Sequence, residues 1–513
     1  MNLQAVGKIL GFLLLLLTGG MVIPLGISSY DFIVSNDPYT ILPLQGLLAG
    51  IAGGLLFSMA LLFLCRAANT NIGSAEAILL VFLSWFIGAI IAALPFYSWA
   101  HFQQSALSIK SPFTNPFNCL FETISGLTTT GASILTNIPA VPDALLFWRA
   151  LVQWYGGLGI VVLFVAILPM IAGANKRLFS AEATGISKDG NTPKIQETAR
   201  TLWLIYFGFT CLQVLVMMLL DPHMSLFTAV TIAFSTTATA GFSIFNESAG
   251  TLLPSVQWTL IVFMMISGVN YGLYYQLLRG RWRSFINDSE FKTYISILLI
   301  AAIIVGFAIQ KTEYNLMTGD AAPHSIEQTI RDAWFQVVSI QTTTGFSNAD
   351  YNTWPLVTHY TLLALMFIGG CGGSTSGGIK VSRILIAFRL FGAQLEKVYR
   401  PAVIRPLRVG NISISESLKI GILLHILAVV ALAFFGAFCL LLFEGDIDGI
   451  TAFSASVAAI NNIGPGLSAV GATSNYAWMT DASKFLLSLL MLIGRLEVFT
   501  VMVLFTKRYW RPK

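Results

Sequence analysis

Charged side chains are scarce in this sequence of 513 residues. Asp, Glu, Lys and Arg make up 10% of it and apolar residues 56%, whereas water-soluble proteins carry about a quarter charged residues. The mean hydropathy is correspondingly high, at +0.76. This composition excludes a water-soluble globule, and the lipid bilayer is the expected solvent of the chain.

Cysteine and histidine are also few, and neither is spaced for metal binding or catalysis. The five cysteines form no CxxC pair, and the five histidines form no HExxH pattern. The sequence therefore predicts no disulfide framework, zinc site or protease site. It also shows no intramembrane cluster of His, Cys or acidic residues, which argues against a membrane-embedded enzyme.

Long apolar runs, by contrast, recur along the whole chain. Ten membrane spans are predicted, at 9–30, 43–65, 77–99, 144–172, 201–220, 256–278, 293–310, 358–390, 418–443 and 483–506. The first run follows Lys8 and could be a secretory signal, but it is long enough to span and no A-x-A cleavage site follows it. We therefore expect a membrane span there.

The net charge of +5 does not indicate a nucleic-acid partner, because the positive residues lie in short segments between the apolar runs. With the N-terminus in the cytoplasm, most of the 29 Lys and Arg residues fall in inward-facing segments. The positive-inside rule then places both termini in the cytoplasm.

Four outward segments contain a second apolar stretch of only about 12 residues, too short to cross the bilayer. We expect these stretches to be re-entrant, and each ends in a small, glycine-containing word. The stretches are Pro116–Thr128, Met224–Thr237, Ile326–Gln341 and Ile447–Ile460. The words read TTTGAS at Thr128–Ser133, ATAGFS at Ala238–Ser243, TTTGFS at Thr342–Ser347 and NNIGPG at Asn461–Gly466.

This internal repeat predicts the fold class. We expect an all-α polytopic membrane protein with four pseudo-repeated helix, pore-loop, helix units around one central pore. An extra two-helix segment, 1–70, precedes the units. The predicted units are 71–175, 195–284, 288–400, which also holds an intramembrane gating loop, and 412–513.

The four words suit a monovalent cation. Non-helical backbone at membrane depth is costly unless it is buried in protein or lines a water-filled cavity, so four such segments indicate one shared cavity. Glycine lets backbone carbonyls converge there, and the words contain no Asp or Glu ring of the kind that divalent-selective pores use. Each word alone could be a turn or a helix-packing surface, but recurrence at four matched positions favours a filter.

The chain resembles the TrkH/TrkG family of bacterial potassium uptake proteins over nearly its whole length. The resemblance rests on the four words, Trp148-Arg149, Gln153-Trp154-Tyr155-Gly156-Gly157, the segment Gly369–Lys380 and Gly494-Arg495-Leu496-Glu497. The helical pair before the first unit is similar to TrkH, whereas the related KtrB proteins lack such a pair.

The resemblance implies potassium as the transported ion, with no organic cofactor in this chain. It also implies a homodimer in the bacterial inner membrane and a cytoplasmic, nucleotide-binding regulator of the TrkA kind. The implied potassium-binding backbone comprises Thr129, Thr130, Gly131, Thr239, Ala240, Gly241, Thr343, Thr344, Gly345, Asn462, Ile463 and Gly464. The fourth word departs most from a threonine-rich filter, so we expect looser discrimination against sodium than four identical loops would give.

One predicted span is interrupted by six glycines in ten residues, and a regular helix will not run through it. It resembles the segment that acts as a gate in the family, while a rigid break at a close helix crossing is the alternative. The implied gate residues are Gly369, Gly370, Gly372, Gly373, Ser374, Thr375, Ser376, Gly377 and Gly378, together with Arg495. The segment is not a phosphate-binding P-loop, because the Lys does not directly follow Gly and is not followed by Ser or Thr.

Arg495 lies inside the last predicted span, where an ionised side chain is costly and usually faces a cavity or a partner. We expect its guanidinium to act as an electrostatic barrier to a permeating cation. A structural ion pair is the alternative, and Glu497, two residues further on, faces another side of the helix.

Four further polar residues lie within predicted helices. Arg149 and Gln153 are one helical turn apart and could form a polar seam between helices or hold the back of a filter loop; we favour a structural role. Glu122 and Asp332 could attract cations near the pore mouth or simply hydrogen-bond neighbouring backbone.

The sequence thus predicts a gated, channel-like potassium translocator controlled by a cytoplasmic subunit. The alternative is a cation-coupled secondary transporter, a K⁺/H⁺ or Na⁺/solute symporter, which also uses broken helices at mid-membrane. Four parallel units argue against it. The basic stretch from Lys380 to Arg408 could dock an acidic partner or anionic membrane lipid.

Overall fold

The computed structural model describes residues 1–35, 37–70, 72–159, 192–310, 325–401, 408–409 and 412–510. Within these ranges the helices and strands are joined by loops. The regular secondary structure is helical apart from one small antiparallel hairpin, β1 (Arg408–Val409) with β2 (Ile412–Ser413). The predicted all-α membrane class is confirmed. Among the described residues, six helices are long and apolar enough to cross a membrane, or eight when two sharply bent helix pairs are counted as spans.

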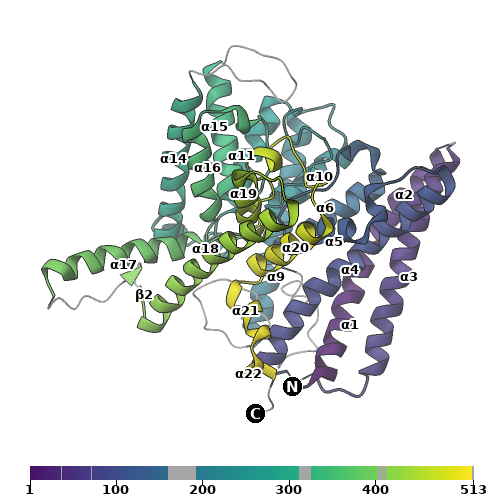
Figure 1. Ribbon diagram of the computed structural model, residues 1–513, viewed down its shortest axis with the longest axis horizontal. Helices are drawn as coiled ribbons and strands as arrows, with labels where there is room; N and C mark the ends of the chain where they lie inside the picture. Colours follow the sequence, from purple (N-terminus) through teal and green to yellow (C-terminus); the bar gives the residue numbers. More distant parts are fainter. Residues whose placement is uncertain are drawn as a thin grey trace.

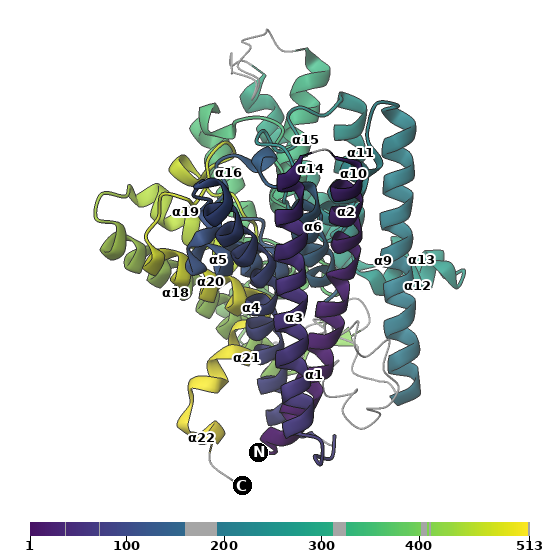
Figure 2. The same cartoon turned by 90° about the vertical axis from the view of Figure 1, so that its right-hand side faces the viewer.

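The N-terminal helices form a bundle along one side of the molecule (Figures 1 and 2). They are α1 (Leu3–Gly20), α2 (Val22–Val34), α3 (Ile41–Leu64) and α4 (Ser74–Leu107). Small residues let them approach closely, since a β-carbon at Gly50 of α3 would lie 2.6 Å from Pro95 of α4. The N-terminus and α22 (Lys507–Trp510), the last described helix, lie near one another at one end of the molecule (Figures 1 and 2).

Each predicted re-entrant stretch contains a short helix that stops at its glycine word. These four short helices are α5 (Pro116–Leu127), α10 (Leu226–Thr237), α15 (Ile326–Gln341) and α19 (Gly449–Ile460). Asn115, Ser225, Ser325 and Asp448 precede them, and each side chain accepts a hydrogen bond from a backbone N–H of the first turn. Such caps fix where each helix begins.

The remaining described helices range from 4 to 29 residues in length. They are α6 (Asp143–Gly157), α9 (Thr192–Leu220), α11 (Pro254–Ser267), α12 (Tyr271–Leu278), α13 (Trp282–Ile286), α14 (Ser289–Ile309), α16 (Leu356–Phe367), α17 (Val381–Tyr399), α18 (Glu416–Glu444), α20 (Asp481–Arg495), α21 (Val498–Met502) and α22 (Lys507–Trp510). Single 3₁₀ turns are η1 (Pro38–Thr40), η2 (Pro112–Thr114), η3 (Ile138–Ala140), η5 (Tyr351–Thr353), η6 (Ser468–Val470) and η7 (Val503–Phe505). The second half of the predicted span 144–172 lies outside the described residues, and the unit boundaries stay predictions.

Two predicted spans, 256–278 and 483–506, are sharply bent, and each counts as a span when its two helical parts are taken together. The chain bends by 90° between α11 and α12 and by 115° between α20 and the helical turns that follow it. Asn270 starts α12 by accepting a hydrogen bond from the Gly272 N–H. Glu497 takes a left-handed conformation with φ 66° directly after α20, which ends that helix.

The glycine-rich loop, Gly369–Gly378, separates α16 from α17, which projects from the body of the molecule (Figure 1). Its two ends are joined by backbone hydrogen bonds of 2.9 Å from Gly369 N–H to Ile379 O and 3.1 Å from Val381 N–H to Gly370 O. The predicted helix break is therefore a closed, hydrogen-bonded loop.

Candidate functional site

The four glycine words adopt the same backbone conformation. We name their central residues loop 1 (Thr129–Gly131), loop 2 (Thr239–Gly241), loop 3 (Thr343–Gly345) and loop 4 (Asn462–Gly464). The first residue of each loop is left-handed, with φ between 51° and 58°, and so is the glycine, with φ between 76° and 96°. L-residues rarely adopt φ in this range, so the likeness between the words is a likeness of backbone geometry.

The loops close into a ring. A β-carbon on each glycine would collide with the carbonyl oxygen of the middle residue of a neighbouring loop. The separations would be 2.3 Å from Gly131 to Ala240, 2.0 Å from Gly241 to Thr344, 2.0 Å from Gly345 to Ile463 and 2.6 Å from Gly464 to Thr130. The loops therefore follow one another in the order 1, 2, 3, 4 and back to 1, and only glycine fits at these positions.

Backbone carbonyls of the ring point away from the short helices. The N–H groups of Thr130, Ala240, Thr344 and Ile463 donate to carbonyls near the ends of those helices, at 2.8, 2.9, 2.8 and 2.9 Å. Peptide bonds are trans in the described residues, and in a trans peptide the carbonyl points opposite to the N–H that follows it. The carbonyls of Thr129, Thr239, Thr343 and Asn462 are therefore directed away from the ends of the short helices.

The glycine-rich loop packs against one end of the ring, where the chain leaves the short helices. Thr375 Oγ1 lies 3.2 Å from each of Thr239 Oγ1, Thr237 O and Ser267 O. The Gly377 N–H donates to Thr343 Oγ1 at 2.6 Å. A β-carbon on Gly377 would lie 2.5 Å from the carbonyl of Asn461, beside loop 4.

The other predicted loop residues shape the loop itself. Gly373 and Gly378 are left-handed, with φ of 75° and 67°. Gly369 leaves no room for a side chain, because its β-carbon would lie 2.1 Å from Gly377 O, and Gly370 is confined by the Ser376 side chain. Ser374 Oγ donates to Cys371 O at 2.6 Å, and Gly372 N–H donates to the Glu290 carboxylate at 2.7 Å.

Arg495 joins the glycine-rich loop to α6. Its guanidinium donates to Thr375 O at 2.7 Å and to the carbonyls of Gly156 and Gly157, each at 2.6 Å. The structure thus brings Arg495 against the segment predicted to be the gate, and its role there stays a prediction. The three carbonyls hold a positive charge directly beside Thr375, the residue of the loop that contacts loop 2.

Arg149 and Gln153 both lie behind loops 1 and 2. The Arg149 guanidinium forms a 2.7 Å ion pair with Glu122 in which both side chains are buried, and it donates to Ser243 O at 2.9 Å. Glu122 also accepts from the backbone N–H of Ile134, just after loop 1, at 2.9 Å. Gln153 Nε2 donates to Ala240 O at 2.7 Å. The sequence left open whether Arg149 and Gln153 form a polar seam between helices or hold the back of a filter loop. Their contacts are those of residues that hold the backs of the loops.

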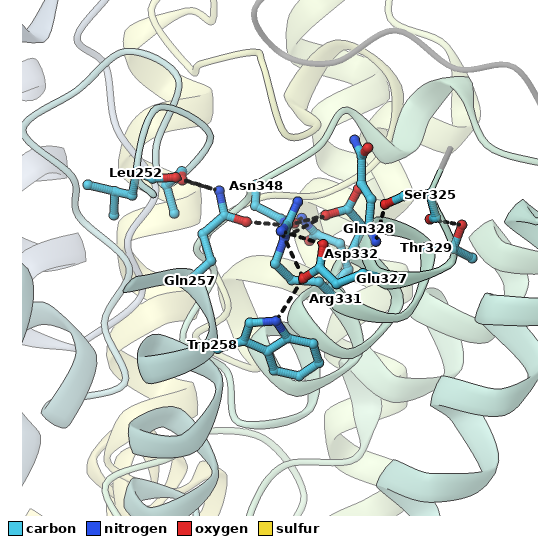
Figure 3. Close-up of polar contacts among 12 residues, drawn as sticks. Leu252, Gln257, Trp258, Ser325, Glu327, Gln328, Thr329, Arg331, Asp332 and Asn348 are labelled. Carbon is cyan, nitrogen blue, oxygen red and sulfur yellow. Dashed lines mark hydrogen bonds and ion pairs between the residues drawn. The ribbon is translucent and has the colours of Figure 1, made fainter. Parts of the chain in front are cut away.

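Asp332 belongs to a polar cluster behind loop 3, shown in Figure 3. It accepts a 2.6 Å hydrogen bond from Asn348, whose amide also donates to Gln257 of α11 at 3.1 Å. Glu327 pairs with Arg331 at 2.9 Å and accepts from Trp258. Asp332 therefore ties the chain after loop 3 to α11, as Glu122 ties the chain after loop 1.

Several residues at the site escaped the sequence reasoning. Tyr476 donates its hydroxyl to Gly464 O at 2.8 Å, and Tyr351 donates to Gly466 O at 2.7 Å. Glu290, at the start of α14, accepts from the Gly372 N–H of the glycine-rich loop and from the Ser382 N–H in the first turn of α17. Asn348 stands three residues after Gly345, at the position that Ile134 holds after Gly131, but the two residue types share no chemistry that marks this position in the sequence.

This arrangement defines the class: a polytopic α-helical membrane protein built around a ring of four loops, each of which follows a short helix. The TrkH family model, described as cation transport protein, matches residues 44–512, so the chain belongs to the TrkH family. The predicted resemblance is confirmed.

Relatives match the chain over its length. The Trk system potassium uptake protein TrkH of Salmonella typhimurium is 35% identical and covers 100% of both chains. TrkI of Halomonas elongata is 32% identical over 98% of this chain and 96% of that protein. The crystal structure of the potassium transporter TrkH from Vibrio parahaemolyticus is similar with a TM-score of 0.84, at 29% identity and full coverage of both chains.

Proposed function

We propose that this chain carries potassium across the bacterial inner membrane through the ring of loops 1 to 4. The closed ring of glycine contacts is the observation that carries the proposal, because it brings four sets of carbonyls around one axis. The names of its relatives, potassium uptake proteins and a potassium transporter, support the choice of ion.

The chemistry of the ring fits a monovalent cation. Inward carbonyls can replace the hydration shell of the ion, and the C-terminal ends of the four short helices direct the negative ends of their dipoles toward it. Loops 1 to 4 contain no carboxylate that would favour a divalent ion. The potassium-binding groups are proposed to be the backbone of the twelve loop residues and the threonine hydroxyls beside them.

The glycine-rich loop is proposed to be the gate, held shut in this structure. Opening requires Thr375 and Gly377 to leave Thr239 and Thr343, with which they are hydrogen-bonded. Arg495 strengthens the closed state in two ways, since it ties Thr375 to α6 and places a positive charge next to the path of a cation.

Control of the gate is proposed to come from outside this chain. A cytoplasmic, nucleotide-binding subunit of the TrkA kind would bind the cytoplasmic face, and the translocating unit would be a homodimer. Both proposals rest on the family resemblance. With both termini cytoplasmic, the basic residues around α17 face the same compartment as that subunit.

Cation flux into liposomes that contain the purified protein tests the proposal. Wild-type protein should pass potassium and rubidium when driven by a membrane potential alone, and sodium more slowly. Gly345→Ser should lose this selectivity, because its β-carbon would lie 2.0 Å from Ile463 O. Gly392→Ser on α17 is the matched control, since a β-carbon there would contact nothing within 4 Å. Unchanged selectivity in Gly345→Ser would refute the filter assignment.

A further inference from the structure

The four loops are of two kinds. Loops 1 and 3 are stabilised by hydrogen bonds within their own segment of the chain. In loops 1 and 3 the middle threonine hydroxyl lies 2.8 or 2.7 Å from the threonine hydroxyl two residues earlier, in the pairs Thr128–Thr130 and Thr342–Thr344. The glycine N–H groups of these loops also reach back to a serine carbonyl of their short helix, at 3.5 and 3.3 Å. Each of these two loops is therefore stabilised by residues of its own glycine word and of the short helix before it.

Loops 2 and 4 lack this brace. Their middle residues are Ala240 and Ile463, which have no hydroxyl, and in the described residues their glycine N–H groups make no such return bond. Instead, side chains that lie outside the loops donate hydrogen bonds to one backbone carbonyl of each loop. Gln153 Nε2 donates to Ala240 O at 2.7 Å, and the Tyr476 hydroxyl donates to Gly464 O at 2.8 Å.

These two carbonyls differ from the others in the ring. Among the described residues, no other backbone carbonyl of loops 1 to 4 accepts a hydrogen bond. Because the ring runs in the order 1, 2, 3, 4, the two loops with engaged carbonyls lie opposite each other. Loops 2 and 4 therefore differ from loops 1 and 3 in their hydrogen bonding, although the engaged carbonyl belongs to the middle residue, Ala240, in loop 2 and to the glycine, Gly464, in loop 4.

The burial of Gln153 carries an energetic penalty, which indicates a specific use for its amide. The side chain is fully buried, and its Oε1 has no hydrogen-bond partner among the described residues. An unsatisfied buried acceptor is unfavourable, whereas an apolar side chain of similar size would avoid the penalty. The amide nitrogen makes one hydrogen bond, and that bond is to the carbonyl of Ala240.

We propose that Gln153 and Tyr476 are specificity-determining positioning residues, which act on the permeating cation through the carbonyls of Ala240 and Gly464. This inference rests on the proposed potassium filter. A donor on a carbonyl draws electron density from the oxygen, so that the oxygen competes less strongly for a cation. The strength and number of carbonyl dipoles help to set the preference among alkali cations, and a weaker field favours potassium over the smaller sodium ion.

The test is the ratio of potassium to sodium flux in liposomes that contain full-length protein, with rubidium as a third ion. Tyr476→Phe removes only the hydroxyl. Gln153→Leu and Gln153→Met both remove the donor, and Met keeps the length of the side chain if Leu folds poorly. Tyr351→Phe is the matched control, because its hydroxyl bonds Gly466 O, outside loop 4.

The potassium-to-sodium ratio should fall by about threefold or more in the Gln153 and Tyr476 variants, the size expected for one hydrogen bond. Tyr351→Phe should keep the wild-type ratio. An unchanged ratio in both test variants would overturn the inference, and so would an equal loss of all three fluxes, since a purely structural brace does not discriminate between ions. Failure of the wild type to pass potassium would instead overturn the proposed function on which the inference rests.

Discussion

The charge pair between Glu122 and Arg149 shows how single residues set the ring. Both side chains are almost fully buried, with 1% and 4% exposure, and their contacts reach the chain that follows loop 1 and the chain that follows loop 2. A buried charge is stable only while it is paired and hydrogen-bonded. We therefore regard this pair as the part of the site most sensitive to single substitution.

Glu122→Gln should destabilise the protein by about 3–5 kcal/mol, because it leaves the Arg149 guanidinium buried without its counter-charge. Thermal unfolding of the purified protein in detergent measures the loss. The double variant Glu122→Gln/Arg149→Met should recover part of it, since no unpaired charge remains. If Glu122→Gln, Arg149→Met and the double variant all melt at the wild-type temperature, the pair does not stabilise the protein.

Arg495→Ala should raise potassium flux, because it removes both a positive charge beside the ion path and the link from Thr375 to Gly156 and Gly157. Arg495→Lys separates these contributions: it keeps the charge but cannot reach three carbonyls with one fork-shaped group. Liposome flux at fixed membrane potential is the measurement. Unchanged or lower flux in Arg495→Ala would contradict the barrier role.

At the residue scale, the sequence was informative where a backbone conformation requires a particular residue type. Thr-x-Gly words predicted the loops because glycine is needed where φ is positive and no β-carbon fits. It could not show which side chains would reach the carbonyls. Gln153 lies 87 residues from Ala240, and Tyr476 carries no local pattern that marks its contact with Gly464.

At the scale of secondary-structure elements, the glycine-rich loop is fixed from both sides by a single carboxylate. Glu290 Oε1 accepts the Gly372 N–H at 2.7 Å and the Ser382 N–H at 2.9 Å, so it joins the start of α14 to the loop and to the first turn of α17. Hydrogen bonds to an ionised acceptor are roughly twice as strong as neutral ones. Glu290 is thus placed to hold the loop closed.

Glu290→Gln should loosen the loop and raise basal potassium flux several-fold, because the amide oxygen is a weaker acceptor than the carboxylate. The control is Glu76→Gln, which alters a similar carboxylate that accepts backbone N–H groups of Gly73 and Asn2 far from the ring. Flux in liposomes without any regulatory subunit is the measurement. Equal flux in wild type and Glu290→Gln would show that the carboxylate does not restrain the loop.

The number and order of the helices were largely predictable from the sequence. The bends within two of the predicted spans were not. Apolar runs of spanning length predicted the helices α3, α14 and α18 nearly to their ends, whereas α4 continues to Leu107, well beyond the predicted span 77–99. The bends after α11 and α20 lie inside apolar runs, where hydrophobicity continues across the break. They depend on an Asn cap at Asn270 and a left-handed Glu497, which are tertiary features that composition does not report.

At the scale of the whole molecule, the ring connects parts of the chain that are hundreds of residues apart. Asn462 donates to Thr130 Oγ1 at 3.0 Å, and Tyr476 N–H donates to Ser133 O at 2.9 Å, so loop 4 closes directly on loop 1. The ring can therefore form only when the last unit has docked on the first. Deletion of the predicted fourth unit, 412–513, should therefore prevent the ring from closing, so that loops 1 to 3 also lose their arrangement.

The proposed orientation is tested by labelling single cysteines placed at opposite ends of the molecule, in a background from which the native cysteines have been removed. Ala67→Cys lies in the exposed turn between α3 and α4, next to the Arg66 carbonyl that Lys8 binds, and Thr473→Cys lies in the exposed segment before α20. A membrane-impermeant thiol reagent should label Thr473→Cys in intact cells and Ala67→Cys only after lysis, because Lys8, Arg66 and the other basic segments hold their side in the cytoplasm. The reverse pattern would invert the proposed topology and place the glycine-rich loop on the outer side of the ring.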